Sequence, residues 1–153
     1  PEARFRIAGA MYPDVHLWPA NCRYDPHLAP GHHPDFYADS RFTLNLTRQA
    51  MVESGYSPSV RLFEAAEAAT PIITDPWPGL EEFFGAGSEL LVAAEGQDIE
   101  RILNGISLDE ATRLGRAAQE RVLAAHTCDQ RAVELQTYLQ QAGCPTARAS
   151  MLS

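Results

Sequence analysis

Short apolar runs alternate along the chain with segments of helical periodicity. Strands are predicted at 4–8, at 21–24 with an interrupted run at 15–18, and at 42–46, 71–74 and 89–93. Helices are predicted at 32–40, from Ser57 or Ser59 to about Ala69, at 79–84, 98–104 and 107–125, and from Thr127 or Asp129 to about Gln141. Strands that alternate with helices indicate an α/β domain with a doubly wound parallel sheet. The predicted domain covers 1–144, and 145–153 is predicted to be a loose tail.

Two of the predicted helices carry a clear apolar face. In the helix that ends near Ala69, we expect Val60, Phe63 and Ala66 to point inward. The helix at 107–125 opens with Ser-Leu-Asp-Glu, which is a capping box. The residues expected on its packed face are Leu108, Ala111, Leu114, Ala118 and Val122.

The composition is that of a globular domain, with 45% hydrophobic and 21% charged residues in 153. The net charge of -8 and the lack of a basic block argue against binding to nucleic acid. No apolar run approaches the roughly 18 residues that a membrane span needs, and no signal peptide opens the chain. The three cysteines are far apart, so we expect reduced thiols and a cytoplasmic protein. The chain enters a strand almost at once after Pro1, which predicts a fragment of a longer protein.

Candidate chemistry gathers where parallel strands end and loops enter helices, the usual ligand edge of such sheets. The segments expected at this edge are 9–13, 45–59 and 74–79. The longest polar loop, 47–59, contains Arg48, Tyr56, Ser57 and Ser59. The helix that follows it offers free N–H groups and a positive dipole end to an anion.

Glu64 lies one or two turns into that helix and could accept hydrogen bonds from sugar hydroxyls. By periodicity alone it shares an exposed stripe with Glu67, one turn later. Arg48 and Arg61 could pair with a phosphate or be solvated surface residues.

Other polar and aromatic residues suggest no separate site. The set of His27, His32, His33 and Asp35 lies in a Pro-rich loop without zinc or iron spacing, so no metal is expected. His126 precedes a helix start and is expected to cap or pack. Trp77 could line a cleft or cover the end of the sheet. The sequence contains no Ser-His-Asp, Walker or Gly-x-Gly-x-x-Gly pattern.

Three runs of residues together carry a family resemblance. They are Phe42-Thr-Leu-Asn-Leu-Thr-Arg48, Tyr56-Ser-Pro-Ser-Val-Arg-Leu-Phe-Glu-Ala-Ala66 and Thr70-Pro-Ile-Ile-Thr-Asp75. With Trp77, Gly79-Leu-Glu81 and Leu90-Leu-Val-Ala93, they resemble the C-terminal half of CgeB-like glycosyltransferases. The run Arg121-Val-Leu-Ala-Ala-His-Thr127, with Arg131, is similar to the closing segment of that group.

The resemblance implies a GT-B glycosyltransferase (glycosyl transferases group 1) built from two Rossmann-like domains. This chain would be the C-terminal domain that binds the nucleotide-diphosphate sugar, and it could lack its own first strand and helix. The absent N-terminal domain of the same polypeptide would hold an unknown acceptor and supply any general base. Transfer would need neither a metal ion nor a cofactor, and the isolated chain would transfer little or no sugar.

The resemblance also assigns roles to residues. Ser57, Ser59 and Val60 would present backbone N–H groups to the diphosphate, and Arg61 or Arg48 would add positive charge. Glu64 matches the second Glu of the Glu-x7-Glu motif, which usually binds the ribose hydroxyls.

The chain departs from the family pattern at two positions. Tyr56 stands where the first Glu of the motif would be, and Ala69 stands where Gly often precedes Thr-Pro. The departure at Tyr56 keeps open a non-catalytic nucleotide-sugar-binding or interaction module, and a GT-B sugar-nucleotide epimerase is a further alternative. A receiver-type domain is disfavoured, because the sequence contains no Lys.

Overall fold

The computed structural model describes residues 3–10, 12, 14 and 17–143. In these ranges the strands are β1 (Phe5–Ala8), β2 (Cys22–Asp25), β3 (Thr43–Asn45), β4 (Ile72–Thr74) and β5 (Leu91–Val92). β1 pairs with β2, and β4 lies between β3 and β5, every pair being parallel. The predicted tail at 145–153 and half of the run at 15–18 lie outside the described residues.

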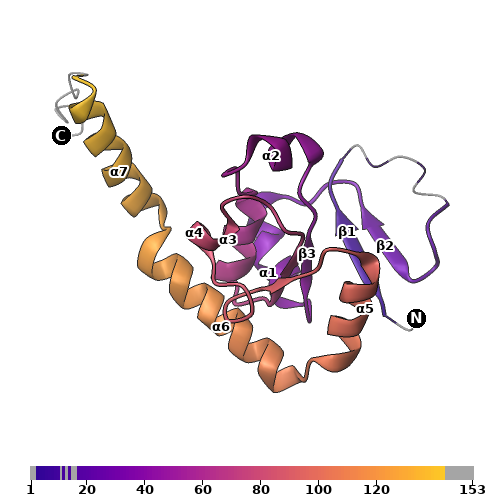
Figure 1. The fold of residues 1–153 in the computed structure, drawn as a ribbon. Helices are drawn as coiled ribbons and strands as arrows, with labels where there is room; N and C mark the ends of the chain where they lie inside the picture. The colour runs from indigo at the N-terminus through magenta and orange to yellow at the C-terminus, as the bar shows by residue number, and fades with distance from the viewer. Residues whose placement is uncertain (1–2, 11, 13, 15–16, 144–153) are drawn as a thin grey trace.

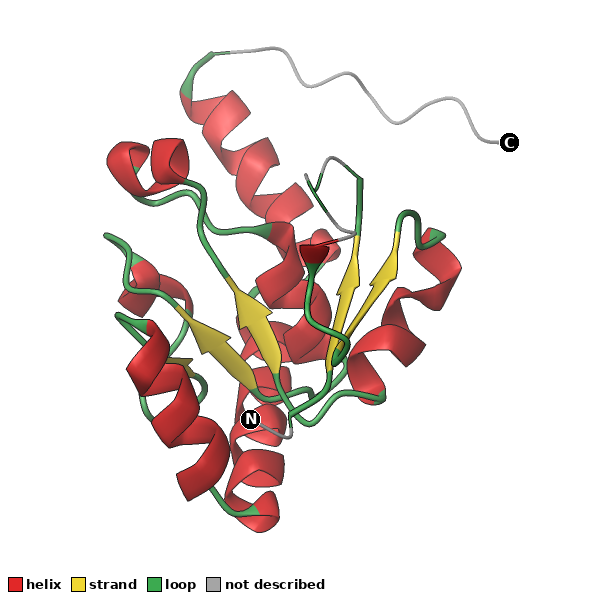
Figure 2. Cartoon of the chain, turned by 90° about the vertical axis from the view of Figure 1, so that its right-hand side faces the viewer, coloured by secondary structure: helices red, strands yellow, loops and turns green. Residues whose placement is uncertain are grey.

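The helices follow the strands in the order that the sequence predicts, with α2 as an addition. They are the 3-10 helix η2 (Pro30–His32), α1 (His33–Ala38), α2 (Gln49–Ser54), α3 (Val60–Glu67), α4 (Leu80–Phe83), α5 (Gly96–Gly105), α6 (Leu108–Ala125) and α7 (Cys128–Gln141). Figure 2 shows helices on either side of the strands. In Figure 1, α7 extends from the end of α6 away from the body of the domain. The predicted parallel α/β class is confirmed.

The core forms around β4, whose three residues are all buried. A central parallel strand is covered on both faces, which explains its continuous apolar run. Leu62, Ala65 and Ala66 of α3 pack into the same cluster as Ile72, and Ala118 and Val122 of α6 close it. Trp77, only 6% exposed, belongs to this cluster and therefore covers the end of the sheet.

The predicted inward faces are wrong at the first residue of two helices. Val60 is 67% exposed and Leu108 is 69% exposed. Each is the first residue of its helix, α3 or α6, directly after the N-cap. A first-turn side chain projects past the packed part of the helix, so periodicity alone does not bury it.

The predicted loop at 47–59 is also corrected, because it contains helix α2. The Arg48 carbonyl accepts hydrogen bonds from the N–H groups of Met51 and Val52 at 2.8 and 3.1 Å, which starts the turn. Val52 packs against the core cluster, and Gly55, with φ 64°, ends the helix. Only residues 55–59 therefore remain as a loop before α3.

Helix α6 packs very closely against the junction between α3 and β4. Ala69, directly after the C-cap of α3, has the left-handed φ of 54°. A Cβ on Gly115 of α6 would lie 2.0 Å from the Ala69 carbonyl oxygen. Glycine at 115 thus permits the contact that holds α3 against α6.

Candidate functional site

A polar network joins the carboxyl ends of β3 and β4. The N–H and hydroxyl of Thr47 both donate to Asp75 Oδ1, at 2.9 and 2.8 Å. The amide of Asn45, which is 3% exposed, donates to the hydroxyl of Thr74 at 3.0 Å. These bonds fix the two strand ends against each other, and so fix where the chain leaves β3 toward α2 and α3.

The segment before α3 is locked onto the segment after β4. The Tyr56 N–H donates to the Pro78 carbonyl at 2.8 Å, and Tyr56 adopts a left-handed φ of 51°. The Tyr56 ring covers Gly79 so closely that a Cβ there would lie 2.4 Å from its Cδ1. This contact requires glycine at 79, and it holds residues 55–59 in place ahead of α3.

The N-terminus of α3 is open. Ser59 is the N-cap, and its side chain makes no capping hydrogen bond. The N–H groups of Val60 and Arg61, at the first two positions of the helix, have no intrahelical acceptor. Ser57 precedes them and is partly buried. The backbone groups assigned to the diphosphate therefore do lie together at one helix end, where the dipole favours an anion.

The two candidate arginines are placed differently. Arg61 lies in the first turn of α3 and is exposed, next to the open N–H groups. Arg48 is exposed and is the N-cap of α2, a full helix earlier in the chain. Arg61 is therefore the candidate cation that belongs directly to the α3 terminus.

Glu64 is not on a free exposed stripe, contrary to what periodicity alone predicts. Its Oε2 accepts a hydrogen bond from the Tyr37 hydroxyl at 3.3 Å, and its Oε1 lies 3.4 Å from His33 Nδ1. Both partners come from α1. The Glu64 side chain keeps 34% of its surface exposed, so it remains accessible to a ligand.

The partners of Glu64 are themselves well anchored. Tyr37 is 6% exposed, and burial, followed by the charge of Glu64, raises the pKa of its hydroxyl to about 12. The hydroxyl is therefore a hydrogen-bond donor throughout the physiological pH range. His33 Nε2 lies 3.3 Å from the Leu28 carbonyl, so both ring nitrogens face acceptors. Both hydrogen bonds can form together only when both ring nitrogens carry a proton.

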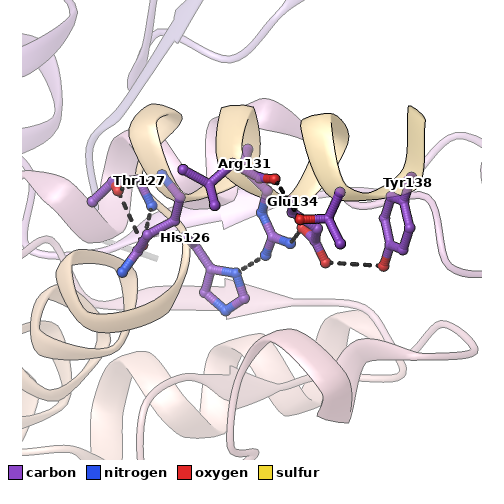
Figure 3. Close-up of polar contacts among 8 residues, drawn as sticks. His126, Thr127, Arg131, Glu134 and Tyr138 are labelled. Atoms are coloured by element: carbon purple, nitrogen blue, oxygen red, sulfur yellow. Dashed lines mark hydrogen bonds and ion pairs between the residues drawn. The ribbon is translucent and has the colours of Figure 1, made fainter. Parts of the chain in front are cut away.

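His126 has the packing and capping role that the sequence predicts. It is the C-cap of α6, and its ring lies 5.5 Å from the Phe63 ring and 5.8 Å from the Phe83 ring, centroid to centroid. Burial and the neighbouring Arg131 guanidinium lower the pKa of His126. Figure 3 shows Arg131 between His126 and Glu134, within a chain of polar contacts along α7.

Arg121 explains another part of the closing segment. Its guanidinium donates to the carbonyls of Phe83 and Glu82 at 3.0 and 3.2 Å, which completes the end of α4. These two hydrogen bonds attach α6 to α4.

Metal-ligating residues do not converge in the described part of the chain. There, no group of three or more His, Cys, Asp or Glu side chains could hold a metal ion. The sequence set is divided, because His33 turns toward Glu64 while His27, His32 and Asp35 are exposed. Among the described helices, none combines the length and the apolar character that crossing a membrane requires.

Sequence reasoning overlooked three contributors to this region. Asn45 and Asp75 belong to matched runs but carry no signal of their partners, since Asn45 bonds Thr74 and Asp75 bonds Thr47, which lie 29 and 28 positions away in the sequence. Tyr37 reads as an ordinary apolar residue of a short helix. Only the packing of α1 against α3 reveals its contact with Glu64.

Comparison with known proteins adds a family and a fold. A family model described as glycosyl transferase-like matches residues 1–137. No curated protein matches the sequence significantly.

Among solved structures, HepE from Anabaena in complex with UDP and glucose is similar, with a TM-score of 0.71 and 13% identity over 94% of this chain and 41% of that chain. Sucrose-phosphate synthase from Thermosynechococcus elongatus has a TM-score of 0.64 and 17% identity over 80% and 30% of the two chains. AviGT4, a glycosyltransferase involved in Avilamycin A biosynthesis, has a TM-score of 0.60 and 17% identity over 92% and 44%. The fold is that of a GT-B glycosyltransferase domain. The chain spans less than half the length of each of these solved chains.

Proposed function

The chain belongs to the glycosyl transferase-like family, and from that premise we propose that it is the donor-binding half of a CgeB-like GT-B glycosyltransferase. It binds a nucleotide-diphosphate sugar at the carboxyl ends of its strands. The sugar is transferred to an acceptor held by an N-terminal domain of the same polypeptide. Reduced cysteines and the nucleotide-sugar substrate fit a cytoplasmic enzyme, which stays a prediction.

One observation carries the proposal: an open helix N-terminus and an accessible carboxylate lie within about one turn of each other on α3. Val60 and Arg61 supply N–H groups for the diphosphate, and Glu64 supplies acceptors for ribose hydroxyls. A nucleotide diphosphate presents both chemistries a few ångströms apart. The solved complexes of HepE with UDP and glucose, and with UDP-glucose, support a ligand of this class.

The chain's own groups can favour departure of the nucleotide. Negative charge develops on the diphosphate as the bond to the sugar breaks, and fixed dipoles at a helix end stabilise such charge without reorganising. The exposed Arg61 guanidinium adds a full positive charge at the same end. The proposed reaction therefore uses backbone dipoles and arginine in place of a metal ion, and it needs no cofactor.

The test is calorimetric titration of the chain with UDP, GDP, ADP, CMP and dTDP and with their common sugars. The Glu64→Gln variant is expected to weaken binding of the preferred nucleotide by about 1–3 kcal/mol, because it removes a charged hydrogen-bond acceptor. Glu67→Gln is the matched control, since Glu67 is an exposed carboxylate one turn later on α3. Equal affinity of a folded Glu64→Gln variant would remove Glu64 from the site.

A non-catalytic binding module is the second candidate, and Tyr56 favours it. Tyr56 occupies the position of the first motif glutamate, and its left-handed backbone and its ring are committed to the contact with Gly79. A carboxylate that would contact the donor sugar is thus replaced by an aromatic ring that lies against Gly79, in a residue that is 62% exposed. Assaying donor hydrolysis and transfer with the full-length protein separates the two candidates: binding without turnover favours the module.

A further inference from the structure

Helices α1 and α3 share one carboxylate. One carboxylate oxygen of Glu64, on α3, accepts a hydrogen bond from the Tyr37 hydroxyl at 3.3 Å, and the other oxygen lies 3.4 Å from His33 Nδ1. In the sequence, Tyr37 lies 27 positions before Glu64 and His33 lies 31 positions before it, so tertiary packing brings them together. α1 packs directly on α3.

This contact joins two helices that follow parallel strands of the two different sheets. α1 starts at His33, after the parallel strand β2, and α3 starts at Val60, after β3. The first residue of α1 and the first turns of α3 meet at Glu64, so both helices begin on the same side of the domain. A helix that follows a parallel strand begins near the carboxyl end of that strand, where ligands bind.

The Glu64 carboxylate still has hydrogen-bonding capacity. A carboxylate offers about four acceptor positions, and α1 occupies one position on each oxygen. The exposed third of the side chain leaves the other positions open to hydroxyl groups. The contacts with α1 therefore fix the direction of the side chain without blocking it.

We propose that Tyr37 and His33 are positioning residues that hold Glu64 ready for the ribose hydroxyls, which makes α1 part of the nucleotide site. The inference rests on the proposed function. A glutamate on a helix surface samples several rotamers, and a ligand that selects one of them binds more weakly by that selection. With α1 in place, Glu64 already adopts one rotamer before the nucleotide binds.

Tyr37→Phe is the first test, because it keeps the buried ring and removes only the hydroxyl. The probe is UDP-glucose, or the tightest binder of the nucleotide panel if another base is preferred. We expect the dissociation constant to rise about 3- to 10-fold, because the nucleotide must then order the Glu64 side chain itself. Tyr138→Phe is the matched control, since the Tyr138 hydroxyl also donates to a glutamate, Glu134, at 3.2 Å on α7. Its affinity should equal that of the wild type.

A double-mutant cycle separates positioning from a general loss of structure. In a Glu64→Gln background, Tyr37→Phe should have no further effect on affinity if the hydroxyl acts through the carboxylate. Thermal unfolding of each variant without ligand reports any change in stability. An undiminished second loss in the Glu64→Gln background would show that Tyr37 acts by another route and would overturn the inference.

His33 gives an independent test. His33→Ala should weaken binding, whereas His33→Gln, which can still donate to Glu64, should recover part of the affinity. His32→Gln is the control, because His32 is the neighbouring histidine and is exposed. If the wild type binds no nucleotide, the proposed function fails. If the wild type binds but Tyr37→Phe and His33→Ala bind equally well, only the positioning role fails.

Discussion

Replacing Ala69 by glycine is expected to stabilise the domain. Ala69 follows the C-cap of α3 with a left-handed φ of 54°. The Thr70 N–H donates a hydrogen bond to the Ala65 carbonyl at 3.0 Å, and the Ala69 N–H donates one to the Ala66 carbonyl at 2.9 Å. This is the backbone position after a helix that glycine normally occupies. The left-handed conformation strains an alanine, because its Cβ approaches the backbone.

The expected gain follows from three opposing contributions. Relief of the left-handed strain is worth about 1–2 kcal/mol. Glycine lowers the stability by about 0.4–1 kcal/mol, because it increases the conformational entropy of the unfolded chain. Loss of the partly buried methyl group lowers the stability by a few tenths of a kcal/mol more, since a fully buried one contributes about 0.8 kcal/mol. The net stabilisation is about 0.5 kcal/mol, or about 1–2 °C for a chain of this length.

Ala68→Gly is the matched control at the neighbouring position. Ala68 has an ordinary φ of −76° and packs against the core cluster, so glycine brings no relief there. Its expected loss is about 1 kcal/mol. Urea unfolding monitored by circular dichroism measures both variants against the wild type. The reasoning is refuted if both variants lose the same stability, since only strain at 69 makes their signs differ.

The sequence predicts the fold well where a local signal coincides with the tertiary structure. The buried strand at 71–74 and the helix start at Ser107 are of this kind, and the structure places β4 and α6 accordingly. Of the predicted capping box at Ser107 one half forms, in which the Ser107 hydroxyl accepts from the Glu110 N–H at 3.2 Å. Helix α2 is missed, because its six residues carry polar groups and little apolar periodicity. Its position depends on the Arg48 carbonyl, on Gly55 and on the core contact of Val52, which only the folded chain provides.

The candidate site shows the same division between local and distant information. The start of α3 is predictable, because Ser59 and Pro58 give a local start signal, whereas the missing capping bond of Ser59 is not. The surroundings of Glu64 are not predictable, because periodicity describes only its own helix. Its environment is decided by α1, a helix that lies about 30 residues earlier in the chain. A residue that looks solvent-facing from its own helix is therefore contacted by a neighbouring helix while it keeps a third of its side chain exposed.

Two further predictions concern the attachment of α6. Gly115→Ala is expected to destabilise the domain by about 2–3 kcal/mol, because the new Cβ would overlap the Ala69 carbonyl; Gly105→Ala, with nothing near its Cβ, is the control in the same urea assay. The second concerns acid stability at His126, whose pKa is lowered by burial and by Arg131. The unfolded chain then binds a proton more readily than the folded one, so this contribution is complete above about pH 6.5 and is lost as the pH falls below it. The wild type should therefore lose more stability between pH 7.5 and pH 5 than His126→Gln does. Equal losses in the two proteins would mean that burial and Arg131 do not oppose protonation of His126 in the folded chain.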